Sequence, residues 1–160
     1  MKHPTSTSDD KARQADLDGH PTDISQSLLF GLLRAREAIM GRMRPIQRAH
    51  GVTEPQWRVL RTLAAKPGIE ATELARSTLL LQPSLTRILR DLRDAGLIER
   101  RSEGASPRRS GIFISKAGLE LVAGAYPELN AVMDEIEQRY GREAMKALTR
   151  DLFELTRSLS

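Results

Sequence analysis

The chain has 160 residues, the length of one domain with a substantial core, and it carries no cysteine, which excludes disulfides, thiolate metal sites, cysteine nucleophiles and thiol-based sensing. Only 4% of its residues are aromatic, which argues against RNA binding through exposed stacking rings, and no apolar run is long enough to span a membrane. The formal net charge of +4 favours a polyanionic partner, and we predict a cytoplasmic protein.

Residues 1–23 are polar and show no hydrophobic periodicity, so they are predicted to form a disordered tail. The two histidines of this tail are too far apart for a usual metal-ligand pattern, and we predict neither a metal nor a cofactor for the chain. Ile24 to His50 then shows a wide apolar stripe at helical spacing, which predicts a first long helix. Pro45 removes one backbone hydrogen bond from it, so a kink is expected near residues 41–44.

Strong helix-start signals follow this first helix. Thr53 is suited to cap a second helix, and Gln56, three residues later, is placed to reach back to the cap. The second helix is predicted to run to about Ala65, with the only tryptophan, Trp57, packed in the core from its first turn. A short third helix is expected over residues 71–77.

The segment from Leu81 to Arg101, LQPSLTRILRDLRDAGLIERR, begins with a basic amphipathic helix. Its apolar residues recur on one face, and its arginines fall on the rest of the cylinder. Pro83 suits the first turn of this helix, and Gly96 suits its end. The short third helix, a tight connection over residues 78–81 and the basic helix together form a helix-turn-helix unit.

A two-stranded ribbon is predicted directly after the basic helix. An apolar run resumes there, and residues 111–115 alternate, with Ile112 and Ile114 on one face. Between residues 76 and 115 the chain has eight arginines against four acidic residues, an excess equal to the net charge of the whole chain. A major-groove helix beside a ribbon with a basic tip is the arrangement of a winged helix-turn-helix, which we place at residues 53–115.

Two more amphipathic helices are predicted over residues 116–160, with Ser115 as the cap of the first and Gly141 as the break between them. The winged helix-turn-helix does not need these helices or the first one to contact DNA, so residues 24–50 and 116–160 are expected to form a dimerisation domain. A two-fold protein suits duplex DNA, where it reads two half-sites; the alternative is an intramolecular bundle. The predicted fold is therefore mainly α, a winged helix-turn-helix with a small β-wing and dimerisation helices at both ends.

This order of elements resembles the MarR family of transcription regulators over residues 24–160. The motifs that carry the resemblance are TEPQWRVLRTLA (53–64), TELA (72–75), the basic segment (81–101) and ISKAGLEL (114–121). Within the family, residues 32–46 followed by TEPQWRVLR are similar to the branch that regulates homoprotocatechuate degradation operons. The resemblance implies a homodimeric repressor that binds a pseudo-palindromic operator. It also implies release by a small aromatic acid or phenol, such as 3,4-dihydroxyphenylacetate or 4-hydroxyphenylacetate.

The resemblance further implies which residues meet double-stranded DNA. At the major groove it places five residues of the basic helix: Gln82, Ser84, Thr86, Arg87 and Arg90. In the minor groove it places Arg108 and Arg109 of the ribbon tip. Arginine bonds a guanine edge with two parallel hydrogen bonds and glutamine does so for adenine, which agrees with these residue types. The family wing commonly has an acid two residues before its arginine, where this chain has Ser106.

For the effector, the resemblance implies a pocket between the dimerisation helices and the DNA-binding unit. The residues expected there are Ser27, Arg34, Arg44, Trp57, Arg58 and Arg61. A guanidinium pairs well with the carboxylate of an aromatic acid, and the tryptophan would lie against its ring. For each arginine taken alone, an ion pair within the protein or a solvated charge is the competing interpretation.

An enzyme is not expected from this sequence. His50 is the only histidine outside the tail, and the sequence has no glycine-rich phosphate loop, nucleophile elbow or metal-spaced cluster. Two other interpretations remain open, a winged helix that serves protein–protein assembly and a non-specific DNA-binding protein without an effector. Salt dependence separates DNA binding from assembly, because DNA affinity falls steeply with added salt through counterion release.

Overall fold

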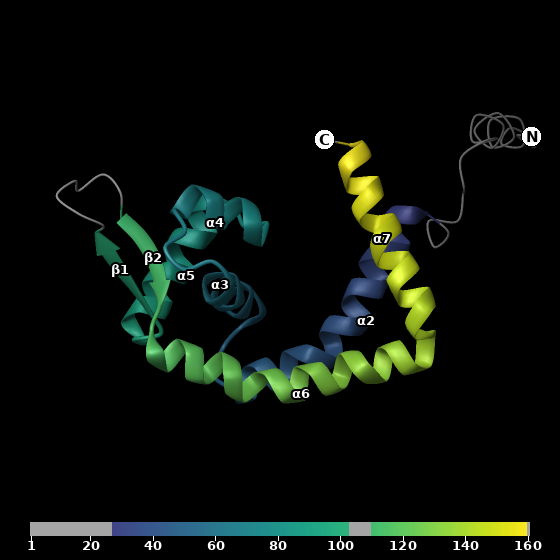
Figure 1. The fold of residues 1–160 in the computed structure, drawn as a ribbon, viewed down its shortest axis with the longest axis horizontal. Coiled ribbons are helices and arrows are strands. Elements are labelled where there is room, and N and C mark those ends of the chain that lie inside the picture. The colour runs from purple at the N-terminus through teal and green to yellow at the C-terminus, as the bar shows by residue number, and fades with distance from the viewer. Residues whose placement is uncertain (1–26, 103–109, 160) are drawn as a thin grey trace, which may run out of the picture. The chain divides into compact units, whose positions relative to one another are not determined.

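The computed structural model describes residues 27–102 and 110–159. Within these residues the chain forms six helices and one antiparallel ribbon, which confirms the predicted fold class (Figure 1). In chain order the elements are α2 (Leu28–Ala49), α3 (Glu54–Ala65), α4 (Ala71–Thr78), α5 (Gln82–Asp94), β1 (Ile98–Ser102), β2 (Ser110–Ile114), α6 (Lys116–Tyr140) and α7 (Arg142–Ser158). The predicted tail, residues 1–23, lies outside the described residues.

The chain divides into two units, Met1–Gly41 and Arg42–Ser160, with the boundary inside α2. The described part of the first unit is the beginning of that helix. There the hydroxyl of Ser27 accepts a hydrogen bond from the backbone N–H of Phe30 at 3.2 Å, so Ser27 caps α2. The apolar stripe of this part is exposed at Leu28, Leu29, Leu32 and Leu33.

The second unit begins with the end of α2 and the predicted start of α3. Gly51 follows α2 with a φ of 77°, and its N–H donates to the carbonyl of Arg48 at 2.9 Å. The hydroxyl of Thr53 accepts from the N–H of Gln56, and the Gln56 side chain accepts from the N–H of Thr53 at 2.9 Å. This is the complete capping box that the sequence predicted.

The helix-turn-helix is formed by α4 and α5 around Leu79. This residue ends α4 in the left-handed conformation, with φ 53° and ψ 40°, and it is 86% exposed. The N–H groups of Leu79 and Leu80 donate back to the carbonyls of Arg76 and Ala75, at 3.2 and 3.1 Å. The basic helix α5 follows after two residues, with a proline in its first turn as predicted.

Both ends of the wing are fixed by the residues that the sequence indicated. Gly96 ends α5 with a φ of 70°, and the N–H of Leu97 donates to the carbonyl of Leu92 at 2.9 Å. After β2, the hydroxyl of Ser115 accepts from the N–H of Gly118 at 3.1 Å and so caps α6.

The ribbon packs one face against the rest of the unit. Ile112 and Ile114 are buried, while Phe113 on the other face is only half-buried, as the alternation predicted. Gly111 lies against the turn before α4, and a Cβ at this position would meet the carbonyl oxygen of Gly68 at 2.7 Å. A glycine is therefore required for this close approach of two backbone segments.

The core of the second unit is formed by α3, α4, α5 and the ribbon, together with the first half of α6. Its fully buried leucines are Leu60, Leu63, Leu74, Leu85 and Leu92. Trp57 is 6% exposed, so it packs in the core as predicted. Ala125 and Leu129 of α6 belong to the same core, because α6 packs on α3. The sequence predicted α6 as a dimerisation helix and did not predict its contact with α3.

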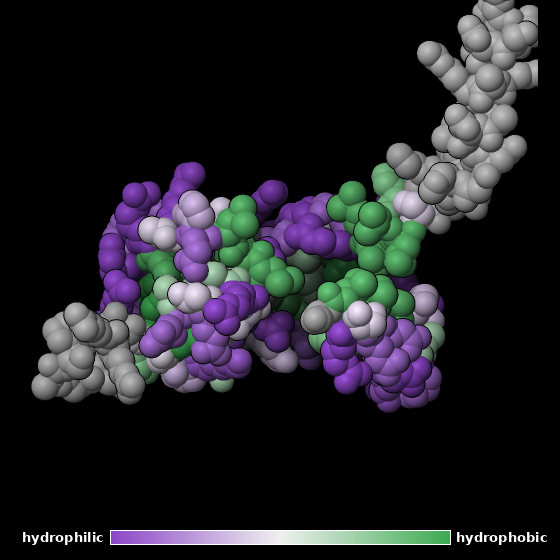
Figure 2. Space-filling view, turned by 90° about the horizontal axis from the view of Figure 1, so that it is seen from above, coloured by the Kyte–Doolittle hydropathy of each residue, from purple (hydrophilic) through white to green (hydrophobic). Residues whose placement is uncertain are grey.

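The last helix differs from the others in its burial. α7, described from end to end, buries none of its residues. Its exposed apolar side chains, with the one that follows it, are Leu148, Phe153, Leu155 and Leu159. Figure 2 shows that hydrophobic surface on the molecule gathers in patches between hydrophilic regions. None of the described helices is long and apolar enough to cross a membrane.

Candidate nucleic-acid interface

The outer face of α5 carries the residues predicted to meet the major groove. Leu85 and Leu92 are each only 1% exposed and fix the inner face of the helix on the core. The five predicted contacts are all exposed on the remaining surface: Gln82, Ser84, Thr86, Arg87 and Arg90. Thr86 donates its hydroxyl proton to the carbonyl of Gln82 at 2.9 Å, which leaves the oxygen of that hydroxyl as an acceptor.

Among the described residues, the arginines of this face have only weak surface ion pairs as partners. Arg87 and Arg90 both lie near the carboxylate of Asp91, with N···O distances of 4.0 and 3.7 Å. Their side chains are 78% and 62% exposed, so such pairs contribute little to stability. Both guanidinium groups are therefore available to exchange Asp91 for a phosphate or a base edge.

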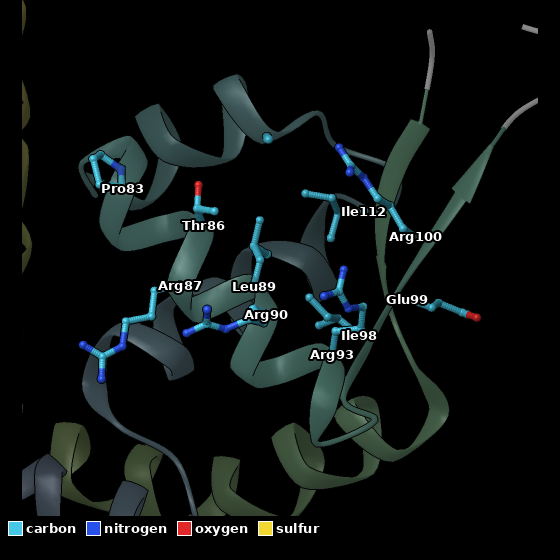
Figure 3. A pocket seen from close by; sticks show the side chains of 11 residues that line it. Pro83, Thr86, Arg87, Leu89, Arg90, Arg93, Ile98, Glu99, Arg100 and Ile112 are labelled. Atoms are coloured by element: carbon cyan, nitrogen blue, oxygen red, sulfur yellow. The ribbon is translucent and has the colours of Figure 1, made fainter. Parts of the chain in front are cut away.

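A groove runs between α5 and β1, with a volume of about 600 Å³. Its floor is apolar and includes Leu89, Ile98 and Ile112. Figure 3 shows arginines around it, with Arg93 on α5 and Arg100 on β1, while the side chain of Glu99 points away from it. The arginines of this rim, between a helix and a wing, suit the phosphates of a nucleic acid.

Arg93 and Arg100 were not among the predicted contacts, although the sequence carried a signal for both. Arg93 follows Arg90 by three residues and so shares its side of the helix. Arg100 follows the buried Ile98 by two residues, and strand alternation puts both on the same face of the ribbon. The neighbouring Arg101 faces the other way, with its guanidinium 5.2 Å from the centre of the Phe113 ring.

The ribbon is described as far as the pairing of Ser102 with Ser110. The predicted minor-groove contacts, Arg108 and Arg109, lie outside the described residues, as does Ser106.

The predicted effector residues are distributed over both units. Ser27 and the exposed Arg34 belong to the first unit, and Ser27 already serves as the cap of α2. In the second unit Trp57 is buried, whereas Arg61 is exposed.

Two of the predicted effector arginines have partners within the second unit. Arg44 donates from its Nε to Glu54 at 3.2 Å. Arg58 donates from Nη1 to the carbonyl of Thr78 at 3.0 Å, and its Nη2 lies 3.7 Å from the other oxygen of Glu54. For these two arginines the competing interpretation, an ion pair within the protein, describes what the structure contains.

The fold and the basic groove define a winged helix-turn-helix regulator of transcription. A model of the MarR family matches residues 50–109. The chain is 38% identical over 126 residues to the homoprotocatechuate degradative operon repressor of Escherichia coli, an alignment that covers 79% of this chain and 85% of that protein. The chain therefore belongs to the MarR family, as its sequence motifs indicated.

Two solved structures of similar fold carry ligands of different kinds. The crystal structure of NadR in complex with 4-hydroxyphenylacetate has a TM-score of 0.73 and 36% sequence identity, and the match covers 84% of this chain and 96% of that chain. The transcriptional repressor CouR, bound to a 23-mer DNA duplex, has a TM-score of 0.75 and 26% identity, with the same coverage of both chains.

Proposed function

We propose that this protein is a homodimeric repressor of an operon for the breakdown of an aromatic compound. It binds a pseudo-palindromic operator and leaves it when a small aromatic acid or phenol binds. The observation that carries the proposal is the exposed basic face of α5 beside the cationic groove of the wing. The similarity to a homoprotocatechuate degradative operon repressor supports the choice of operon.

In this proposal the residues of the interface divide by what they contact. Arg87, Arg90 and Gln82 lie on the exposed face of the recognition helix, where bidentate bonds to base edges give sequence preference. Arg93 and Arg100 line the groove and contact phosphate, which gives affinity and position without sequence information. Arg108 and Arg109 remain predicted contacts in the minor groove.

Dimerisation follows in this proposal from apolar surface that a monomer would leave in water. α7 has 17 residues and buries none of them, although most of the stability of helices in proteins comes from packing of an apolar face. Phe153 and Leu159 are 67% and 80% exposed, so a second copy that covers α7 would bury a row of large side chains.

The effector proposed is 3,4-dihydroxyphenylacetate, 4-hydroxyphenylacetate or a close analogue. The structure of NadR holds 4-hydroxyphenylacetate, and this chain resembles NadR over most of its length. Within residues 27–102 and 110–159, Arg34 and Arg61 have no acidic partner, whereas Arg44 and Arg58 do. We therefore assign the carboxylate to Arg34 or Arg61, while Ser27, Arg44, Trp57 and Arg58 remain predicted effector residues.

The test is a DNA-binding titration with the intergenic duplex next to the gene of this protein, against a random duplex of equal length. Preferential binding to the intergenic duplex that either aromatic acid abolishes supports the whole proposal. Preferential binding that neither compound weakens would reject the proposed effector and still support a sequence-specific regulator. Equal binding to both duplexes at moderate salt rejects sequence-specific regulation and favours a non-specific DNA-binding protein or an assembly module.

A further inference from the structure

The turn between α4 and α5 is a strained segment next to the DNA-reading surface. Leu79 has a left-handed backbone, a conformation that L-residues other than glycine, asparagine and aspartate rarely adopt, and its side chain is exposed. Three residues later Gln82 begins the recognition helix. The direction of α5 at its start therefore depends on how firmly this turn is held.

Most of the bonds that hold the turn come from α4 itself. The hydroxyl of Thr78 donates to the carbonyl of Leu74 at 2.6 Å, and the N–H of Leu80 donates to the carbonyl of Ala75. One bond comes from a different helix, because Arg58 of α3 donates from Nη1 to the carbonyl of Thr78 at 3.0 Å. This carbonyl belongs to the last residue of α4, where helix carbonyls lack intrahelical partners and a cation is favoured by the helix dipole.

Arg58 is in turn held by a carboxylate that also binds α2. Its Nη2 lies 3.7 Å from one oxygen of Glu54, and the other oxygen of Glu54 accepts from Nε of Arg44 at 3.2 Å. The side chain of Glu54 is only 14% exposed, so water screens these contacts less than those on the surface. A series of side-chain contacts thus runs from Arg44 of α2 through Glu54 and Arg58 of α3 to the turn before the recognition helix.

We propose that Arg58 is a positioning residue for sequence reading by α5, and that Glu54 and Arg44 set the position of Arg58. The proposal rests on the proposed function as a DNA-binding regulator. A shift of the Thr78 carbonyl moves the start of α5, where Gln82 and Ser84 lie. Bidentate bonds to bases need exact placement, whereas phosphate contacts by flexible arginines adapt to a small shift. Loss of Arg58 therefore lowers operator affinity more than affinity for random DNA.

The test uses the full chain, the variants Arg58→Met and Arg58→Lys, and the control Arg139→Met. Arg139 is 76% exposed on α6 and pairs with Glu135, so the control removes the same charge away from the turn. The Nε of Arg58 is buried and has no hydrogen-bond partner among the described residues. Arg58→Met removes this unfavourable group together with the two contacts, so the variant is expected to fold.

Arg58→Met is expected to bind the operator duplex about tenfold more weakly, as for the loss of one hydrogen bond to a charged group, and random duplex within about twofold of the unaltered chain. Arg58→Lys is expected to recover part of the operator affinity, since an ammonium also donates to a carbonyl. Arg139→Met is expected to change neither affinity selectively. Equal losses on both duplexes, or no loss on either, would overturn the positioning role.

A second measurement does not depend on the difference in affinity between operator duplex and random duplex. Hydrogen exchange at the amides of Leu79 and Leu80 reports the opening of the turn. Faster exchange in Arg58→Met but not in Arg139→Met supports the proposal, and unchanged exchange overturns it. If the unaltered chain shows no operator preference, the proposed function fails, and the exchange result alone decides the role of Arg58.

The series back to α2 is tested with Glu54→Gln, which keeps the size of the side chain and removes its charge. Because Arg58 loses its ionic anchor, this variant is expected to show the same selective loss on the operator and the same faster exchange, in smaller degree. If Glu54→Gln has the operator affinity and the exchange rates of the unaltered chain, Glu54 does not set the position of Arg58. Only the positioning role of Arg58 itself would then remain.

Discussion

The hydroxyl of Ser115 donates a hydrogen bond to the carbonyl oxygen of Gly96 at 2.7 Å. The Oγ of Ser115 also accepts from the N–H of Gly118, so one side chain caps α6 and ties the end of α5 to it across the wing. The backbone N–H of Ser115 also donates to the carbonyl of Leu97 at 3.0 Å. This junction fixes the base of the ribbon relative to the recognition helix.

Ser115→Ala is expected to lower the free energy of unfolding by about 1–2 kcal/mol, because it removes the helix cap and leaves the Gly96 carbonyl without this partner. Ser115→Thr keeps a hydroxyl at the cap and should lose much less. Urea denaturation followed by circular dichroism measures both changes. Equal stability of the alanine variant and the unaltered chain would show that water replaces both bonds.

Leu79→Gly is expected to raise the free energy of unfolding by about 0.5–1 kcal/mol. Glycine adopts the left-handed conformation without steric penalty, which outweighs the greater entropy of glycine in the unfolded chain. Little burial is lost, since Leu79 is 86% exposed. Leu81 is the matched control, because it is 78% exposed but has an ordinary φ of −68°. Leu81→Gly should therefore destabilise the protein in the same denaturation experiment.

Substitution by alanine should change stability in opposite directions at two glycines, because one is crowded by backbone atoms and the other has free space. A Cβ on Gly111 would lie 2.7 Å from a backbone oxygen of Gly68, so Gly111→Ala should displace the ribbon and lower the unfolding free energy by about 1–3 kcal/mol. A Cβ on Gly124 of α6 meets only the His50 ring, at 3.8 Å. Gly124→Ala should therefore stabilise the helix by about 0.5–1 kcal/mol. A stabilising Gly111→Ala would contradict the close approach of the two segments.

The sequence predicted those features that depend on residues close together in the chain. The capping box of Thr53 and Gln56, the end of α5 at Gly96 and the cap of α6 at Ser115 each need only a few consecutive residues, and all three are confirmed. The exposed face of α5 followed from helical periodicity in the same way.

The features that the sequence did not predict depend on contacts between distant residues. The bond from Arg58 to the Thr78 carbonyl joins positions 20 residues apart, and nothing in either local pattern indicates it. The left-handed Leu79 was not predicted because its residue type argues against that conformation. Arg100 lines the groove with Arg93 only because β1 packs beside α5. Long-range packing therefore decides which of the many arginines lie together.

The ion pair between Arg42 of α2 and Glu135 of α6 makes stability depend on pH. Hydrogen bonding by the Arg42 guanidinium, aided by the charge of Arg139, holds the pKa of the Glu135 carboxyl below its ordinary value of 4.5. A carboxyl whose pKa is lowered on folding adds stability above its unfolded pKa and loses it as pH falls through the folded pKa.

Glu135→Gln is therefore expected to be less stable than the unaltered chain at about pH 7, with a difference that shrinks as the pH falls through the lowered pKa of the Glu135 carboxyl. Because the pair is on the surface, added salt should shrink the same difference. Thermal melts at several pH values measure it. A difference that is constant with pH would show that the carboxylate of Glu135 contributes through its shape and hydrogen bonding alone.

Arg87 and Arg100 should respond differently to truncation, because one is assigned to bases and the other to phosphate. Arg87→Ala is expected to weaken binding to the operator duplex by about 1–3 kcal/mol and to leave binding to random duplex much less affected. Arg100→Ala is expected to weaken both by similar factors and to reduce the slope of log affinity against log salt by about 1. Titrations of both duplexes at three or more salt concentrations give the affinities and the slopes together. Equal losses for Arg87→Ala on both duplexes would reassign Arg87 to phosphate, and a selective loss for Arg100→Ala would place a base edge, rather than the backbone, in the groove between α5 and β1.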